Sequence, residues 1–298
     1  MRHFIGLIAL AAAVAQPPAG KKVYISVDME GISGVGSETL VSAAGSEYER
    51  GRKLMAADTN AAIRGAIAGG AREVVVNDSH GSHANLRIED IGPGARLITD
   101  AFKRYGMMQG LDESFDAVLF VGYHAKAGST RGFFAHTGDA NVRDLEIDGR
   151  SVGEGGMNAL FAAWYGVPVV LITGDDVAVE QYKESDPGVR SVVVKRAINT
   201  RAGELRPLDD VHREIEVAAR EGVANARKAP PRHSATVRVK LRFRDTLTPE
   251  LAEILPTMER PAPDTIAFTS DSMPRAYSLI RLLYRWINPP PPRPGYDY

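Results

Sequence analysis

The sequence predicts an α/β fold, in which helices flank a mainly parallel sheet and a smaller α+β extension follows toward the C-terminus. Short apolar, β-favouring runs alternate with longer segments of helical periodicity, the pattern of βαβ units. The run at residues 117–121 is apolar throughout, as in a strand buried on both faces. Residues 237–243 instead alternate apolar and polar side chains, which is typical of an antiparallel pair with one exposed face.

The individual elements follow from periodicity and from the residues between them. Helices are expected where apolar residues recur every three or four positions, and strands where β-branched residues form short runs. The glycine pair at 69–70 ends the first helix, and Asp148-Gly149 is a hairpin turn. In chain order we expect a strand at 23–27, a helix at 46–68, strands at 73–77 and 116–122, a hairpin at 145–152, a helix at 157–165, a strand at 167–173, a helix at 177–183, a strand at 191–195, a helix at 207–227, a strand at 235–243 and a helix at 274–286.

The two ends of the chain differ from its middle. Arg2 and His3 precede an apolar run at 4–14 and the small-residue sequence Ala13-Val14-Ala15. This is the pattern of a secretory signal peptide, and the run is too short to span a bilayer. We therefore expect cleavage near Ala15-Gln16, a periplasmic or secreted protein, and no stable membrane insertion after cleavage. The predicted divisions are a signal peptide at 1–15, a leader at 16–21, an α/β core at 22–195, a C-terminal subdomain at 196–288 and a disordered, proline-rich tail at 289–298.

Composition excludes several classes of function. The 298 residues are 44% hydrophobic and 24% charged, which is ordinary for a globular protein. The formal net charge is −1, so there is no electrostatic basis for binding nucleic acid. There is no cysteine, which excludes disulfides, thiolate metal sites and cysteine nucleophiles. His, Asp and Glu remain as metal ligands.

Three of the predicted strands end in side chains that can hold a metal. Asp28 and Glu30 follow the first strand, His80 follows the second, and His124 follows the third. Residues i and i+2 of a strand share a face, so Asp28 and Glu30 point the same way and repel each other unless a cation lies between them. The carboxyl ends of parallel strands form one edge of a sheet. The sequence therefore predicts a metal site at this edge, within the core at 22–195.

The same residues lie in motifs that resemble a known family. The run Val27-Asp28-Met29-Glu30-Gly31-Ile32-Ser33-Gly34 resembles the opening motif of the D-aminopeptidase family of binuclear zinc peptidases (DppA-like, peptidase family M55). Four further motifs follow in the order of that family, and together they cover roughly residues 22–285. These motifs are Asn77-Asp78-Ser79-His80, Gly122-Tyr123-His124-Ala125, Gly153-Glu154 and Gly174-Asp175-Asp176.

The resemblance implies a metal set and a catalytic residue. Asp28, Glu30, His80, His124 and Glu154 are then the ligands of two Zn²⁺ ions per subunit, with Co²⁺ or Mn²⁺ as substitutes. Spacing alone does not bring Glu154 to the site, because it follows the hairpin, so its assignment rests on the resemblance. Three carboxylates and one bridging hydroxide balance the four positive charges, and one carboxylate bridges the ions, for which Asp28 is the best placed.

The resemblance also implies an activity. It is that of an exported aminopeptidase which uses a metal-activated water to hydrolyse short peptides with an N-terminal D-residue, such as D-alanyl peptides. His136, in a loop after the His124 strand, matches the histidine that is catalytic and not a ligand in the family. The family further implies a homo-oligomer, for which a decameric ring is one form.

Other polar residues near the motifs have open or simpler interpretations. Asp78 is expected to orient a histidine ligand. Asp175 and Asp176 either hold the α-ammonium of a substrate or cap the next helix, and the sequence does not decide between these. His83 departs from the family pattern. His83, His212 and His233 are expected to be surface residues.

Two other functions fit a cluster of carboxylates and histidines. One is a dimetal phosphoesterase or another amidohydrolase, since such ligand sets also serve those reactions. The other is an exported protein that binds a metal or a peptide without catalysis, although the intact ligand set argues against it.

Overall fold

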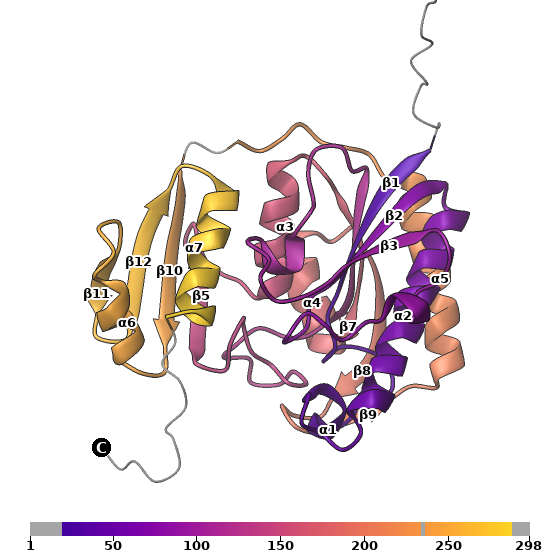
Figure 1. The fold of residues 1–298 in the computed structure, drawn as a ribbon, viewed down its shortest axis with the longest axis horizontal. Coiled ribbons are helices and arrows are strands. Elements are labelled where there is room, and N and C mark those ends of the chain that lie inside the picture. Colours follow the sequence, from indigo (N-terminus) through magenta and orange to yellow (C-terminus); the bar gives the residue numbers. More distant parts are fainter. Residues whose placement is uncertain (1–19, 234–235, 288–298) are drawn as a thin grey trace, which may run out of the picture.

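The computed structural model describes residues 20–233 and 236–287 (Figure 1). The predicted signal peptide, residues 16–19 of the predicted leader and the predicted tail lie outside these residues. Within the described ranges, no helix combines the length and the apolar character needed to cross a membrane.

The larger of the two sheets forms the predicted parallel core. In the described part of the chain it contains seven strands, of which β9 alone runs antiparallel to its neighbour β8. From one edge to the other the strands are β3 (Ala95–Ile98), β2 (Ala71–Asp78), β1 (Lys21–Val27), β4 (Ala117–Tyr123), β7 (Val169–Asp175), β8 (Arg190–Ala197) and β9 (Gly203–Leu205).

Helices cover both faces of this sheet, and strand alternation decides which side chains meet them. Helices α2 (Tyr48–Ala68) and α5 (Leu208–Asn225) lie side by side on one face (Figure 1). Val23, Ile25 and Val27 of β1 point to that face, whereas Tyr24 points to the opposite one. The opposite face is covered by α3 (Glu154–Trp164) and α4 (Asp176–Ser185).

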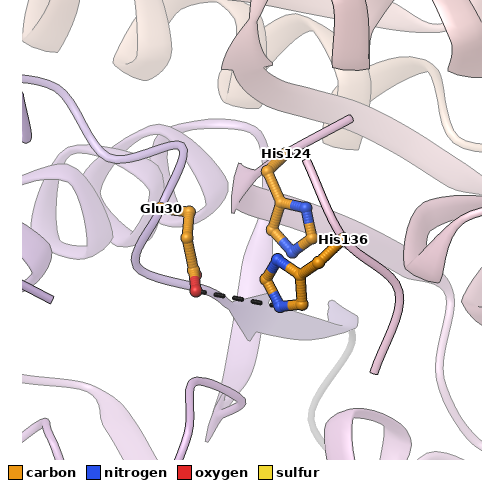
Figure 2. A group of neighbouring side chains, drawn as sticks. All are labelled: Glu30, His124 and His136. Atoms are coloured by element: carbon orange, nitrogen blue, oxygen red, sulfur yellow. Dashed lines mark ion pairs between the residues drawn. The ribbon is translucent and has the colours of Figure 1, made fainter. Parts of the chain in front are cut away.

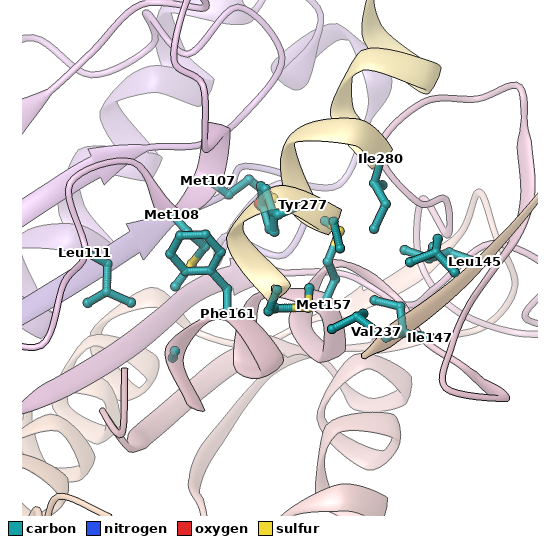
Figure 3. Close-up of a cluster of buried hydrophobic side chains, with 14 of the residues drawn as sticks. Met107, Met108, Leu111, Leu145, Ile147, Met157, Phe161, Val237, Tyr277 and Ile280 are labelled. Carbon is teal, nitrogen blue, oxygen red and sulfur yellow. The ribbon is translucent and has the colours of Figure 1, made fainter. Parts of the chain in front are cut away.

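A second, antiparallel sheet packs beside the α3 face (Figure 1). Helix α7 (Met273–Arg285) contacts both this sheet and α3. Figure 3 shows the apolar cluster that joins these parts, in which Phe161 of α3 and Tyr277 of α7 meet with an edge-to-face ring contact. The strands of the second sheet, in order, are β11 (Glu259–Ala262), β12 (Thr265–Ser270), β10 (Val237–Phe243), β5 (Val142–Ile147) and β6 (Arg150–Ser151).

The sheets do not follow the division that the sequence suggested at residue 195. The hairpin β5–β6 comes from the predicted core but pairs with β10. Helix α5 comes from the predicted C-terminal subdomain but packs on the first sheet. Several short elements were not expected. They are the helices α1 (Glu38–Val41) and α6 (Leu247–Ala252), the 3₁₀ turns η1 (Ile88–Asp90) and η2 (Gly106–Met108), and strands β3, β9, β11 and β12.

Candidate metal centre and active site

The first sheet brings the predicted ligands to one edge because their strands are neighbours. Strands β2, β1 and β4 lie next to each other and run parallel. Asp28 and Glu30 follow β1, His80 follows β2, and His124 follows β4 directly. Convergence therefore comes from sheet order and not from nearness in the sequence.

The turn after β1 needs a glycine at position 31. The Gly31 N–H donates to the Gly122 carbonyl at 2.8 Å, so the backbones after β1 and within β4 lie close together. A Cβ at Gly31 would lie 1.9 Å from the Tyr123 carbonyl oxygen. Only glycine allows this approach, which carries Glu30 back toward the ends of β2 and β4.

Asp28 belongs to two of the three groups of potential ligands among the described residues. Its Oδ1 lies 3.4 Å from Nδ1 of His80, which is itself 2.9 Å from Oε2 of Glu30. Its Oδ2 lies 3.3 Å from Nε2 of His124, which is 3.4 Å from Oε2 of Glu154. In each of these two groups, Asp28–Glu30–His80 and Asp28–His124–Glu154, the ligand atoms lie within 4.8 Å of one another, and the same holds for the third group, Glu30–His124–His136.

Glu154 reaches this cluster from the start of α3. The β5–β6 hairpin returns the chain from the second sheet, and α3 begins at Glu154 itself, three residues earlier than the sequence predicted. The backbone N–H of Gly138 donates to Oε1 of Glu154 at 2.6 Å and fixes the carboxylate.

Each histidine of the site is anchored on a backbone carbonyl through one ring nitrogen. Nε2 of His80 lies 2.9 Å from the Val41 carbonyl oxygen, and Nδ1 of His124 lies 2.9 Å from that of Ala125. Nδ1 of His136 lies 2.9 Å from the Phe134 carbonyl oxygen. A carbonyl accepts only from N–H, so the other nitrogen of each neutral ring presents a lone pair to the carboxylates. This is the arrangement of histidine ligands whose second nitrogen is fixed by the protein.

His136 lies over His124 and differs from it in exposure. Their rings stack with centroids 4.0 Å apart and an angle of 10° between planes, and Figure 2 shows Nε2 of His136 directed to Glu30. That nitrogen lies 3.9 Å from Oε1 of Glu30 and 3.7 Å from Oε1 of Glu154. The side chain of His136 is 29% exposed, whereas that of His124 is 1% exposed. His136 is therefore the histidine that a bound substrate can contact.

The residues present fit a metal centre. Oδ2 of Asp28 and Nε2 of His124 are buried and have no hydrogen-bond partner among the described residues. A carboxylate oxygen and an imidazole lone pair that face each other repel unless a cation lies between them, and burial increases this cost. Imidazole and carboxylate are ligands that zinc accepts.

The electrostatics of the cluster favour added positive charge. Burial raises the pKa of Asp28, and the like charge of Glu30 adds to this shift. Burial opposes ionisation of Glu30 and Glu154, but the adjacent histidines outweigh it, holding the pKa of Glu30 well below its usual range and that of Glu154 at about 2. Despite burial, the carboxylates hold the pKa of His80 and of His124 well above the ordinary value. Protons and metal ions therefore compete for the same site.

The model of peptidase family M55, described as D-aminopeptidase, matches residues 21–282. The chain belongs to the D-aminopeptidase family. A D-aminopeptidase of Bacillus subtilis (strain 168) is 36% identical over 264 residues, which are 88% of this chain and 96% of the relative. A solved structure, the Zn-dependent D-aminopeptidase DppA from Bacillus subtilis, described as a self-compartmentalizing protease, has a TM-score of 0.85 and 34% identity, covering 89% of this chain and 97% of that chain. The predicted family, α/β fold class and peptidase class are confirmed.

Other residues of the D-aminopeptidase motifs shape the site without reaching its centre. The carboxylate of Asp78 was expected to orient a histidine, but it accepts hydrogen bonds from the backbone N–H groups of Asn85 and Leu86 and from the Asn85 amide. It fixes the loop after His80. Asp175 caps α4, accepting from the N–H groups of Val177 and Ala178, although its Oδ2 is buried without a partner in the described chain.

Asp176 does not cap α4, a role that falls to Asp175. Its carboxylate accepts the Ala197 N–H at 2.8 Å and pairs with Arg131 at 2.5 Å. These contacts tie the start of α4 to the end of β8.

Two of the three histidines expected at the surface are not surface residues. His83 is buried, with Nδ1 2.9 Å from the Asp78 carbonyl oxygen, and its φ is 56°. Burial, with Lys103 nearby, lowers its pKa to about 2, so the ring is neutral. His212 is half-buried and pairs with the fully buried Asp58 at 3.0 Å. His233 is exposed as expected, against the ring of Trp164.

A buried lysine that was not predicted from the sequence supports the ligand loop. Nζ of Lys195 donates to the carbonyls of Glu30 and Val35 at 2.7 and 2.6 Å, and it lies 4.9 Å from the Phe133 ring centroid. Burial lowers its pKa to about 7. The only signal in the sequence was a charged residue at the end of an apolar strand, the same kind of signal that identified Asp28.

Proposed function

We propose that the chain is an exported D-aminopeptidase that uses two zinc ions to hydrolyse short peptides with an N-terminal D-residue, such as D-alanyl peptides. The proposal of two ions rests on the two carboxylate oxygens of Asp28. Its Oδ1 faces His80, and its Oδ2 faces His124. A carboxylate with one oxygen in each of two ligand groups is suited to bridge two cations.

The charge of the site supports the same number. Asp28, Glu30 and Glu154 supply three negative charges, and His80 and His124 are neutral ligands. One hydroxide would then balance the charge of two Zn²⁺ ions. Bound zinc supplies a Lewis acid for the scissile carbonyl and lowers the pKa of water so that a nucleophile is present at neutral pH.

His136 acts on the substrate in this proposal. Its Nδ1 is held by the Phe134 carbonyl, and its Nε2 borders the ligand cluster and the space beyond it. From there it can donate to the oxygen on which negative charge develops, or carry a proton for the leaving amine. Its greater exposure and its longer distances to the carboxylates support this role over that of a ligand.

Substrate and assembly are proposed from the relatives. Both are named as D-aminopeptidases, and the solved one is described as self-compartmentalizing. We extend D-residue specificity and homo-oligomer formation to this chain, with a decameric ring as the form to test. Export is proposed from the signal-peptide pattern at 1–15.

Metal analysis of ligand variants tests the site. Elemental analysis of gently purified protein should give about two zinc ions per chain. His80→Ala and His124→Ala should each lower that number together with activity. Full occupancy in both variants would remove these residues from the ligand set.

A substrate panel separates the rival functions. Metal-loaded protein should hydrolyse D-alanyl peptides faster than the L-alanyl counterparts and faster than phosphate esters. Preference for a phosphate ester would favour the phosphoesterase, and tight peptide binding without turnover would favour the binding protein. Intact mass from the native host should show loss of residues 1–15, and recovery of the full-length chain would exclude cleavage there.

A further inference from the structure

A small cavity joins the ligand cluster to two arginines of the C-terminal helix. The cavity has a volume of about 90 Å³, which is room for several water molecules. Glu30 and His80 lie on its metal side, and Arg281 and Arg285 lie on its α7 side. These arginines are four residues apart, so they lie on the same face of the helix.

Neither arginine forms an ion pair with a carboxylate of the described residues. Arg281 is 3% exposed, and its Nη1 donates to the Lys103 carbonyl. Nη2 of Arg285 donates to the Gly81 carbonyl at 2.9 Å. A guanidinium has five N–H donors and a full charge. Besides its carbonyl, Arg281 has the hydroxyl of Tyr284 as a hydrogen-bond partner, and neither partner carries a negative charge.

A buried arginine without a carboxylate is costly, unless an anion binds beside it during the working cycle. The carboxylates of Asp28, Glu30 and Glu154 do not serve as this anion, because the proposed zinc ions and hydroxide already balance them. The positive charge on the α7 side therefore remains available to a ligand, and it disfavours the ammonium end of a peptide.

We infer that Arg281, with Arg285 beside it, binds the C-terminal carboxylate of a short peptide whose scissile bond lies at the ligand cluster. This inference rests on the proposed function and names the residues that bind the far end of its peptide substrate. Arginine suits the task, because its planar fork can donate two parallel hydrogen bonds to a carboxylate.

Peptide length sets how far the carboxylate lies from the scissile bond. In a dipeptide three bonds join the scissile carbonyl carbon to the carboxylate carbon, so the two carbons are roughly 3–4 Å apart. Each further residue moves the carboxylate about 3.5 Å away. A second cavity of about 640 Å³ shares Glu30, His136 and Gly138 with the first. The amino-terminal residue then lies toward this larger cavity, which fixes the direction of the peptide.

The experiment compares D-alanyl-D-alanine with its C-terminal amide, in wild type and in Arg281→Gln and Arg285→Gln. Wild type should prefer the free acid by roughly 10- to 100-fold in kcat/KM, the worth of a charge-assisted hydrogen bond. Arg281→Gln should remove most of this preference by raising KM for the free acid much more than for the amide. Arg275→Gln is the matched control, since Arg275 lies on the exposed side of α7 beside Asp271.

The outcomes separate this inference from the proposed function. Equal hydrolysis of acid and amide by wild type, or an equal loss on both in Arg281→Gln, overturns the carboxylate site. D-Alanine p-nitroanilide has no carboxylate and tests the proposed function alone, so failure to cleave any D-alanyl compound overturns both. If Arg281→Gln does not fold, Arg281→Lys should keep part of the preference and Arg285→Gln should reduce it. An unchanged preference in both variants contradicts the inference.

Discussion

Replacing His136 by alanine should slow the reaction while the metals and the fold remain. The ring is 29% exposed and its main contact is the stack on His124, at 4.0 Å between centroids. Such a stack contributes about 1 kcal/mol, so the loss of stability should be small. A donor to the developing oxyanion contributes about 10²–10³ in kcat, or roughly 3–4 kcal/mol. The effect on rate therefore exceeds the effect on stability.

The stacked partner provides the matched comparison. His136→Ala and His124→Ala remove the same ring from adjacent positions, but only His124 has its free nitrogen between Asp28 and Glu154. Zinc content, melting temperature and steady-state kinetics on a D-alanyl peptide should be measured for both. We expect His136→Ala to keep its zinc and lose kcat with a smaller change in KM, and His124→Ala to lose zinc.

Two results would refute this reasoning. If His136→Ala loses zinc, then His136 is a ligand, as its position near Glu30 and His124 allows. If its activity stays within a few-fold of wild type, the residue serves only to pack against His124.

Three further predictions concern the residues around the centre. Asp28→Asn should reduce the affinity for both zinc ions, whereas Glu154→Gln should reduce mainly the affinity for one. Zinc titration measures both affinities, and the same pattern of loss in the two variants would contradict bridging by Asp28. Lys195→Met should lower the free energy of unfolding by roughly 2 kcal/mol, because two buried carbonyls lose their donor. Urea unfolding measures this change, and an unchanged free energy of unfolding would show that the lysine is dispensable. The hydrogen bond to Asp58 raises the pKa of His212. The stability that this pair contributes is therefore complete below about pH 6.5 and is lost as the pH rises through the raised pKa. His212→Gln should lower the melting temperature more at pH 6 than at pH 9, and an equal loss at both would exclude the charged pair.

Much of the fold and half of the site follow from patterns that the sequence displays directly. Asp28, Glu30, His80 and His124 each follow a strand of the parallel sheet, and the carboxyl ends of neighbouring strands must meet. No knowledge of side-chain packing is needed for that step. The five predicted strands of this sheet are also local features, since each contains a short apolar run, whereas the short strands β3 and β9 do not.

The remaining features depend on contacts between distant segments. Glu154 reaches the site only because a hairpin leaves the first sheet, pairs with a strand about 95 residues later and returns at α3. Arg281 looks like a solvent-facing residue of an amphipathic helix until α7 packs against the site. His83 is likewise buried, within the loop that Asp78 fixes. These contacts between distant segments cannot be predicted from sequence periodicity.

Stepwise return of zinc to chelator-stripped protein tests the central claim most directly. Hydrolysis of a D-alanyl peptide should be negligible without zinc and should rise until about two equivalents per chain, while the L-alanyl peptide is cleaved much more slowly throughout. Full activity at one equivalent, full activity without zinc, or a preference for the L-peptide at two equivalents would contradict a two-zinc D-aminopeptidase.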